Sequence, residues 1–151
     1  MKSTADTLPH RLRQLHDGLK RAGVKLTHQR LEVCREIAMA TSHPNAEMVF
    51  NGVRERVPTI SLDTVYRTLS LLVELGLIDK LGVAQETMRF DGNMVPHHHF
   101  VCTQCGAIHD FYSEWLDHLS LPDDVRVFGR VQKVQVEVRG SCQRCTQDDQ
   151  S

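Results

Sequence analysis

Two pairs of cysteines lie in the last third of the chain, Cys102 with Cys105 and Cys142 with Cys145. Two residues separate the thiols of each pair, so each C-x-x-C turn can direct two sulfurs at one point. Two such turns complete a four-thiolate shell of the kind that binds zinc. Three consecutive histidines at positions 97–99 precede the first pair. Imidazole suits harder metals than four thiolates do, so the sequence indicates two metal sites of different character.

A second group of donors surrounds these histidines. On a strand, His97 and His99 would point to the same face and His98 to the opposite one. Asp110 lies on a neighbouring predicted strand, Asp91 in a connecting segment, and His43 in a loop of the first half. The full set is His43, Asp91, His97, His99 and Asp110. Three imidazoles and two carboxylates suit Fe(II), Mn(II) or Zn(II). Each histidine alone is more often an ordinary surface or hydrogen-bonding residue, so the argument for metal binding lies in the group.

Composition places the chain among ordinary globular proteins. It has 151 residues, 40% of them hydrophobic and 25% charged. Residues 1–90 contain 13 Lys/Arg against 10 Asp/Glu, a net charge of +3, whereas residues 91–151 contain 5 against 9, a net charge of −4. The basic half is the better candidate for a polyanionic partner. We find neither a signal peptide nor an apolar stretch of membrane-spanning length, so we expect a cytoplasmic protein with no membrane partner. In that reducing compartment, paired cysteines are more often metal ligands than disulfides.

The first half predicts four helices and a hairpin. Apolar residues recur at helical spacing up to Gly23, and Thr27, Asn45 and Ser61 are plausible N-caps of the next three helices. Gly76 ends the fourth helix, and residues 77–83 and 86–90 read as a short hairpin. Helices followed by a hairpin predict a winged helix-turn-helix over residues 1–90.

The second half reads as a smaller domain with strands. Residues 91–96 break the pattern and are expected to form a hinge. Strands are predicted at 99–102 and 107–111, a short helix at 113–119, and a longer extended region at 125–139. The fold class is therefore α+β, with a winged helix followed by a small α/β domain over residues 97–151 that contains the four cysteines.

The fourth helix has a polar face that could contact DNA. Asp63, Tyr66, Arg67 and Ser70 project from one side of it. Arg67 could bridge guanine O6 and N7 or grip a phosphate, and Tyr66 offers a ring and a hydroxyl. A solvated helix face is the other interpretation of the same spacing.

The motifs together resemble those of the ferric uptake regulator family over residues 10–145. They are Gly23-Val-Lys-Leu-Thr-His-Gln-Arg30, Ser42-His43-Pro44, the 61–69 segment, Arg89-Phe90-Asp91, His97-His-His-Phe-Val-Cys-Thr-Gln-Cys-Gly106 and Cys142-x-x-Cys145, in family order. The resemblance implies a homodimeric DNA-binding repressor whose C-terminal domain dimerises. It implies structural zinc on the four cysteines and regulatory Fe(2+) or Mn(2+) on the set His43, Asp91, His97, His99 and Asp110. It also implies DNA contacts by Lys25, Tyr66 and Arg67, and we add Thr64 on the same helix.

Asp110 indicates the branch of the family. The peroxide-sensing branch resembles this chain in having Asp there, whereas iron-uptake regulators usually have Glu. A further metal site of iron regulators would need a carboxylate and a histidine where this chain has His98 and Val134, so we expect that site to be missing. His28 departs from the proline that is common at its position in the family.

These observations predict a non-enzymatic repressor that senses peroxide. The resemblance implies that iron-catalysed oxidation of a ligand imidazole, His43 or His97, would release the protein from a palindromic operator. One alternative is an iron- or zinc-uptake regulator of the same family. Another, of a different class, is a metal-dependent hydrolase, for which Glu114 and His109 are the nearest candidate bases but lie at no recognisable catalytic spacing. We expect no catalytic residues and no small organic substrate.

Overall fold

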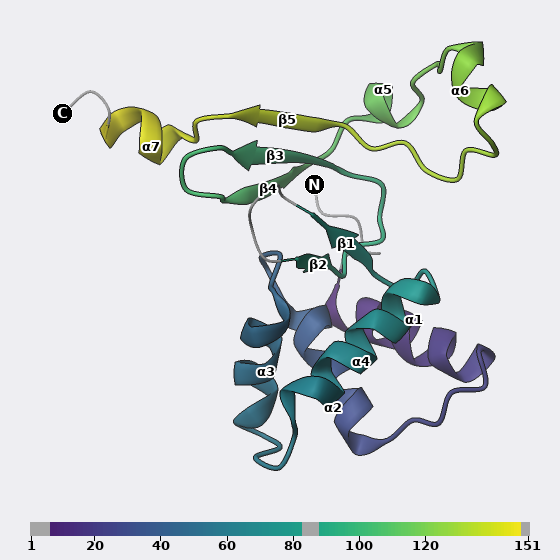
Figure 1. The fold of residues 1–151 in the computed structure, drawn as a ribbon, viewed down its shortest axis with the longest axis vertical. Helices are drawn as coiled ribbons and strands as arrows, with labels where there is room; N and C mark the ends of the chain where they lie inside the picture. Colours follow the sequence, from purple (N-terminus) through teal and green to yellow (C-terminus); the bar gives the residue numbers. More distant parts are fainter. Residues whose placement is uncertain (1–6, 83–87, 149–151) are drawn as a thin grey trace. The chain divides into compact units, whose positions relative to one another are not determined.

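The computed structural model describes residues 7–82 and 88–148 of the chain. The chain divides into two compact units, Met1–Val95 and Pro96–Ser151. The first holds four helices and a two-stranded sheet, and the second a three-stranded sheet with short helices (Figure 1). No helix in the described ranges is long and apolar enough to span a membrane.

The last three of the four helices of the N-terminal unit begin where the sequence places their caps. The four helices are α1 (Leu8–Arg21), α2 (His28–Met39), α3 (Ala46–Arg54) and α4 (Leu62–Glu74). The side chains of Thr27, Asn45 and Ser61 each accept a hydrogen bond from the backbone N–H three residues on, which satisfies an otherwise unpaired donor of the first turn. Gly23 and Gly76 follow α1 and α4 with φ of 72° and 69°, a conformation that favours glycine.

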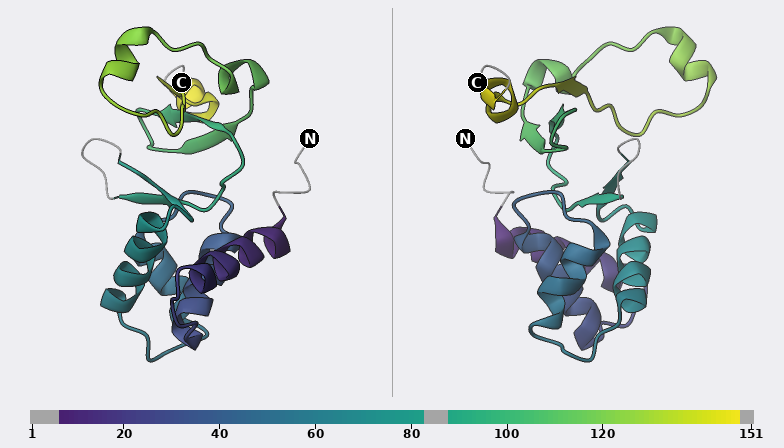
Figure 2. Two further views of the ribbon diagram at one scale, coloured as in Figure 1. Left: turned by 90° about the vertical axis from the view of Figure 1, so that its right-hand side faces the viewer. Right: turned by 60° about the vertical axis from the view of Figure 1, so that its left-hand side comes forward.

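A single apolar core joins these helices. Val33 and Ile37 of α2, Val49 of α3, and Leu69 and Leu72 of α4 are all at most 1% exposed. Figure 2 shows the helices crossing one another around this centre.

Cys34 also lies in this core, where burial raises the pKa of its thiol to about 12. It is therefore a small buried residue with an unreactive thiol.

The hairpin follows α4. Strands β1 (Asp79–Leu81) and β2 (Arg89–Asp91) pair antiparallel, with Asp79 opposite Asp91. The predicted hairpin is thus present, although residues 83–87, between which its turn was expected, lie outside the described residues. Four helices and this hairpin form the expected winged helix-turn-helix.

The C-terminal unit is built on β3 (His98–Cys102), which lies in the middle of the order β4-β3-β5. Strand β4 (Ile108–Phe111) pairs antiparallel to β3, and β5 (Glu137–Gly140) pairs parallel to it. Helix α5 (Glu114–Asp117) begins at Ser113, whose side chain accepts from the Leu116 N–H. Helix α7 (Gln143–Asp148), which the sequence did not predict, begins directly after Cys142 and contains Cys145.

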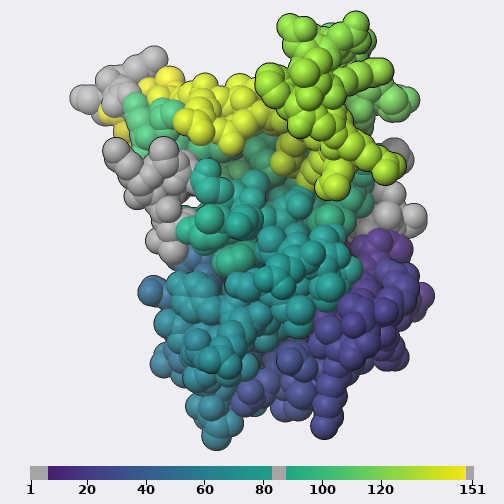
Figure 3. Space-filling model, turned by 45° about the vertical axis from the view of Figure 1, so that its right-hand side comes forward, coloured from purple at the N-terminus to yellow at the C-terminus, as the bar shows by residue number. Residues whose placement is uncertain are grey.

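The extended region predicted at 125–139 is partly wrong. Its beginning belongs to α6 (Asp123–Val127), and a strand is present only from Glu137. Pro122 and the acidic pair Asp123 and Asp124 explain the helix, because proline and carboxylates favour a first helical turn. Figure 2 shows α6 at the outermost point of the long connection between β4 and β5, and Figure 3 shows that it forms a protruding surface.

Candidate metal centres and nucleic-acid surface

The four cysteines converge at one end of the C-terminal sheet. Cys102 closes β3 and lies opposite Gly140 of β5, so the parallel pairing brings the two C-x-x-C turns together. The Sγ atoms of Cys102 and Cys145 are 3.9 Å apart, and those of Cys105 and Cys142 are 3.8 Å apart. All four sulfurs lie within 4.8 Å of one another. A zinc tetrahedron with Zn–S bonds of about 2.3 Å has edges of about 3.8 Å, so this spacing fits a four-thiolate zinc site.

Backbone N–H groups favour the thiolate form of two of the four cysteines, Cys102 and Cys105. The N–H groups of Cys105 and Cys142 point at the Cys102 sulfur and lower the pKa of its thiol to about 6. The Ala107 N–H likewise lowers the pKa of Cys105. Cys145 behaves oppositely, because its contact with the Cys142 sulfur raises the pKa of its thiol to about 12. A cation must therefore displace the proton of Cys145, whereas Cys102 is already a thiolate at neutral pH.

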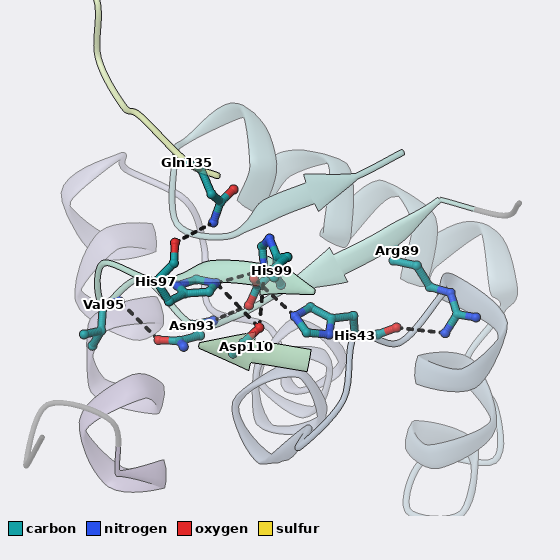
Figure 4. Close-up of polar contacts among 9 residues, drawn as sticks. His43, Arg89, Asn93, Val95, His97, His99, Asp110 and Gln135 are labelled. Atoms are coloured by element: carbon teal, nitrogen blue, oxygen red, sulfur yellow. Dashed lines mark hydrogen bonds and ion pairs between the residues drawn. The ribbon is translucent and has the colours of Figure 1, made fainter. Parts of the chain in front are cut away.

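A second donor group lies in the N-terminal unit. His43 is in the loop between α2 and α3, and its Nε2 is 3.4 Å from Oδ2 of Asp91 at the end of β2. The side chains are only 7% and 4% exposed. The Phe90 N–H donates to the Pro44 carbonyl at 2.9 Å, and the Arg89 guanidinium donates to the His43 carbonyl at 3.0 Å (Figure 4). The wing strand thus holds the histidine loop beside its partner carboxylate.

Asp91 is fixed from the other side as well. Its Oδ1 accepts from the Asn93 N–H at 2.9 Å, and the Asn93 side chain accepts from the Val95 N–H at 3.2 Å. These successive side-chain turns order the segment expected to be a hinge up to Val95. They leave Oδ2 of Asp91 directed at His43.

A third donor group lies in the C-terminal unit. The Nε2 atoms of His97 and His99 are 3.1 Å apart, and the rings meet edge to face at 85°. Oδ1 of Asp110, which pairs with His99 across the β3–β4 ladder, is 3.3 Å from His99 Nε2 and 3.8 Å from His97 Nε2. Metal–nitrogen bonds of about 2.1 Å place neighbouring ligands of one ion about 3 Å apart, so two imidazoles at this distance fit a shared metal ion. Figure 4 shows the three side chains pointing at one another.

The predicted ligands of the regulatory metal therefore form a pair in one unit and a trio in the other. Each group is preformed within its own unit. Sequence reasoning assigned no structural role to the residues that hold the first group, Arg89 and Asn93, although Arg89 belongs to one of the quoted motifs. Asn93 also carried a local signal, because asparagine two residues after an aspartate in a turn-forming segment is typical of successive side-chain turns.

The residues predicted to contact DNA lie on the N-terminal unit. Tyr66 and Arg67 are on the exposed side of α4, and Lys25 is exposed just before α2. Arg67 Nε is 2.9 Å from Oδ2 of Asp63 one turn earlier, with both side chains largely in solvent. Thr64 differs, because its hydroxyl is bonded to the capping Ser61 at 2.9 Å. A cavity of about 280 Å³ separates the start of α2 from α4, and it is lined by Thr27, Gln29, Arg30, Thr64, Arg67, Thr68 and Leu71.

The chain is similar to known metal- and peroxide-responsive regulators. It is 30% identical over 149 residues to the peroxide-responsive repressor PerR of Staphylococcus epidermidis, covering 98% of this chain and 99% of that protein. Among solved structures, the peroxide stress regulator of Campylobacter jejuni matches with 28% identity and a TM-score of 0.64, over 89% of this chain and 98% of that one. The ferric uptake regulator of Helicobacter pylori matches with 23% identity and a TM-score of 0.72, over 93% and 94%, and supports the fold. The family model of the ferric uptake regulators covers residues 21–122, and the chain belongs to that family.

Proposed function

We propose that the protein is a metal-dependent DNA-binding repressor that releases its operator after reacting with peroxide. The observation that carries the proposal is the split donor set, His43 with Asp91 in one unit and His97, His99 and Asp110 in the other. One metal ion that took all five donors would fix the orientation of the winged helix relative to the second unit. Metal binding and DNA binding would then share a coupling free energy.

The donor chemistry supports iron or manganese at this site. Imidazole and carboxylate together suit Fe(II) and Mn(II), whereas the four thiolates suit zinc. The cysteine cluster would hold structural zinc and contribute folding free energy to the C-terminal unit. We assign the two metals to the two sites on this basis.

Peroxide sensing is supported by the relatives and by Asp110. The S. epidermidis relative is a peroxide-responsive repressor, and the C. jejuni structure is a peroxide stress regulator. A bound ferrous ion would supply the electrons that split peroxide, whereas a manganese ion in the same site would not. We expect one oxygen to be added to the imidazole of His43 or His97, which would lose its place as a ligand.

DNA binding is assigned to α4 and to the start of α2. Lys25, Thr64, Tyr66 and Arg67 would contact the duplex, with α4 in the major groove. One solved structure with this fold is a zinc uptake regulator complexed with zinc and DNA. We propose a homodimer on a palindromic operator in the cytoplasm. The C-terminal unit supports dimerisation, because Trp115, Val127 and Phe128 are 75%, 84% and 88% exposed.

Iron- or zinc-uptake regulation by the same site remains the second candidate. A metal-loaded protein that ignores peroxide would favour it. A hydrolase has no comparable support, because neither Glu114 nor His109 belongs to the candidate metal-binding groups found among the described residues.

Metal-dependent DNA binding by two single-site variants tests the proposal. Duplexes selected from a random pool by the manganese-loaded protein would serve as probes, with affinity followed by fluorescence anisotropy. We expect manganese to strengthen binding, and His43→Ala and Asp110→Asn each to abolish that gain while zinc content stays constant. His109→Asn, an exposed histidine on β4, is the matched control. Loss of the gain in only one of the two variants would place the ion in a single unit and contradict the proposal.

A further inference from the structure

His98 lies between two of the proposed ligands but has a different environment. Its side chain is fully buried, and both ring nitrogens have partners. The Val136 backbone N–H donates to Nδ1 at 3.1 Å, and Nε2 is 3.0 Å from Oδ1 of Asp117 at the end of α5. The ring also packs on Phe111 of β4, with centroids 5.5 Å apart.

These contacts define the tautomer of His98. Because Nδ1 accepts from a backbone N–H, the proton of the neutral ring is on Nε2 and is donated to Asp117. Neither nitrogen is then available to a cation, so His98 is not a metal ligand in this arrangement.

The segment that His98 binds also holds its two neighbours. The Gln135 side-chain amide donates to the His97 carbonyl at 3.1 Å. The His99 N–H donates to the Val136 carbonyl at 3.0 Å. Residues 97, 98 and 99 are therefore each bonded to residue 135 or 136. We call His98, Asp117, Gln135 and Val136 the histidine clasp.

We propose that His98 is a positioning residue for the regulatory metal, acting through the histidine clasp on the backbone of His97 and His99. The inference rests on the proposed function, since it concerns the ligands named there. Strand β3 pairs with β5 from His99 onward, whereas His97 precedes β3, and its carbonyl is held by the clasp. Without the clasp, residues 135 and 136 would no longer hold the backbone of His97 and His99, whose Nε2 atoms are 3.1 Å apart. Residues that orient metal ligands in this way typically change affinity by about 10- to 100-fold when they are replaced.

Three substitutions of His98 distinguish the contribution of its bond to Val136 from that of its bond to Asp117. His98→Asn keeps an acceptor near the position of Nδ1, for the Val136 N–H, but does not reach Asp117. His98→Gln keeps a donor near the position of Nε2 but loses the δ acceptor. His98→Leu loses both, and His109→Asn on the exposed side of β4 controls for loss of a histidine beside Asp110.

The experiment measures Mn(II) affinity of the full-length protein, the ligand-field spectrum of Co(II) in the regulatory site, and zinc per chain. We expect His98→Leu to weaken Mn(II) binding by about 10- to 100-fold and to alter the Co(II) spectrum, with zinc retained. His98→Asn should lose less affinity than His98→Gln, because it keeps the bond to the clasp backbone. His109→Asn should match the wild type.

The contrary outcomes are distinct. Wild-type protein without a Mn(II) site would overturn the proposed function and this inference with it. Wild-type binding together with unchanged affinity and spectrum in His98→Leu would overturn only the positioning role. Loss of zinc from all three His98 variants would overturn it too, because His98 would then hold the whole sheet rather than the ligands.

Discussion

Ligands of two kinds occur within the short stretch 97–102, and their surroundings set their chemistry. His97 and His99 meet at Nε2 beside Asp110, a carboxylate that favours a harder cation. Cys102 ends the same strand, where two backbone N–H groups lower the pKa of its thiol. A soft thiolate site and a harder imidazole site can therefore lie close together in sequence and still select different metals.

The length of the side chain at position 110 is expected to matter for peroxide sensing. Asp110→Glu should keep manganese-dependent DNA binding, because a carboxylate remains. It should blunt peroxide sensitivity, because the longer side chain moves the carboxylate relative to His97 and His99. The measurement is the peroxide concentration at which iron-loaded protein releases DNA, with Asp17→Glu on the exposed side of α1 as the control. Equal sensitivity of Asp110→Glu and wild type would count against the peroxide-sensing assignment.

The cysteine cluster predicts a pH dependence of zinc binding. The pKa of about 12 for Cys145 means that zinc must displace its proton throughout the neutral range. Apparent zinc affinity should therefore rise with pH, by about tenfold per unit from this one proton. Below pH 6 the dependence should steepen, because Cys102, with a pKa of about 6, also becomes protonated. Competition with a chelator of known proton affinity measures this, and a flat profile between pH 6.5 and 8 would refute it.

Among the secondary-structure elements, strands β2 and β3 place the donor groups of the proposed regulatory site. The wing strand β2 holds the loop that contains His43, through Phe90 and Arg89, and it ends in Asp91. On the other unit, β3 aligns His99 with Asp110 and Cys102 with Gly140. The first donor group therefore depends on hydrogen bonds between a strand and a loop, and the second on the register of β3 with β4.

Gly92 follows β2 directly and lies against Ile37 of α2, so a substitution there tests how closely these two segments pack. A Cβ at this position would lie 2.8 Å from Ile37 Cγ2 and 3.1 Å from the Ile37 carbonyl oxygen, a backbone atom that cannot move aside. Gly92→Ala should destabilise the N-terminal unit by about 1–3 kcal/mol and weaken manganese binding, because Asp91 is the preceding residue. Gly82→Ala is the control, since its nearest neighbour would be Met88 Cε at 3.9 Å. Denaturant unfolding and manganese titration that show no difference between the two variants would contradict this packing.

Local signals explain which elements the sequence could predict. Thr27, Asn45 and Ser61 mark helix starts by a mechanism that acts within one turn, and the structure confirms all three. The prediction of an extended region at 125–139 was partly wrong, because period-two alternation is weaker evidence than a partner strand and only residues from Glu137 pair with one.

The features of the candidate site that could not be predicted from the sequence depend on contacts between residues far apart in the chain. The cysteine spacing predicted the thiolate cluster, but not that a parallel ladder would place Gly140 opposite Cys102. The bond from Arg89 to the His43 loop joins residues 46 apart in sequence, and no periodicity signals such a contact. The role of His98 likewise depends on Val136 and Asp117, which no spacing rule connects to it.

At the scale of the whole molecule, the proposed mechanism depends on the division of ligands between two units. Neither His43 with Asp91 nor the trio on the second unit supplies five donors, so an ion that binds both gains affinity only when the units are suitably oriented. By linkage, DNA that favours this orientation should tighten metal binding by the same factor as metal tightens DNA binding. Oxidation of one ligand would weaken both at once.

Peptide mass spectrometry after exposure to a stoichiometric amount of hydrogen peroxide tests this account most directly. Iron-loaded and manganese-loaded proteins would be treated in parallel and digested, and the peptides that contain His43 and His97 compared. We predict a gain of one oxygen on one of these histidines in the iron-loaded protein, in proportion to the loss of DNA binding, and no gain with manganese. Loss of DNA binding without oxidation of either histidine, or equal oxidation with both metals, would contradict the account.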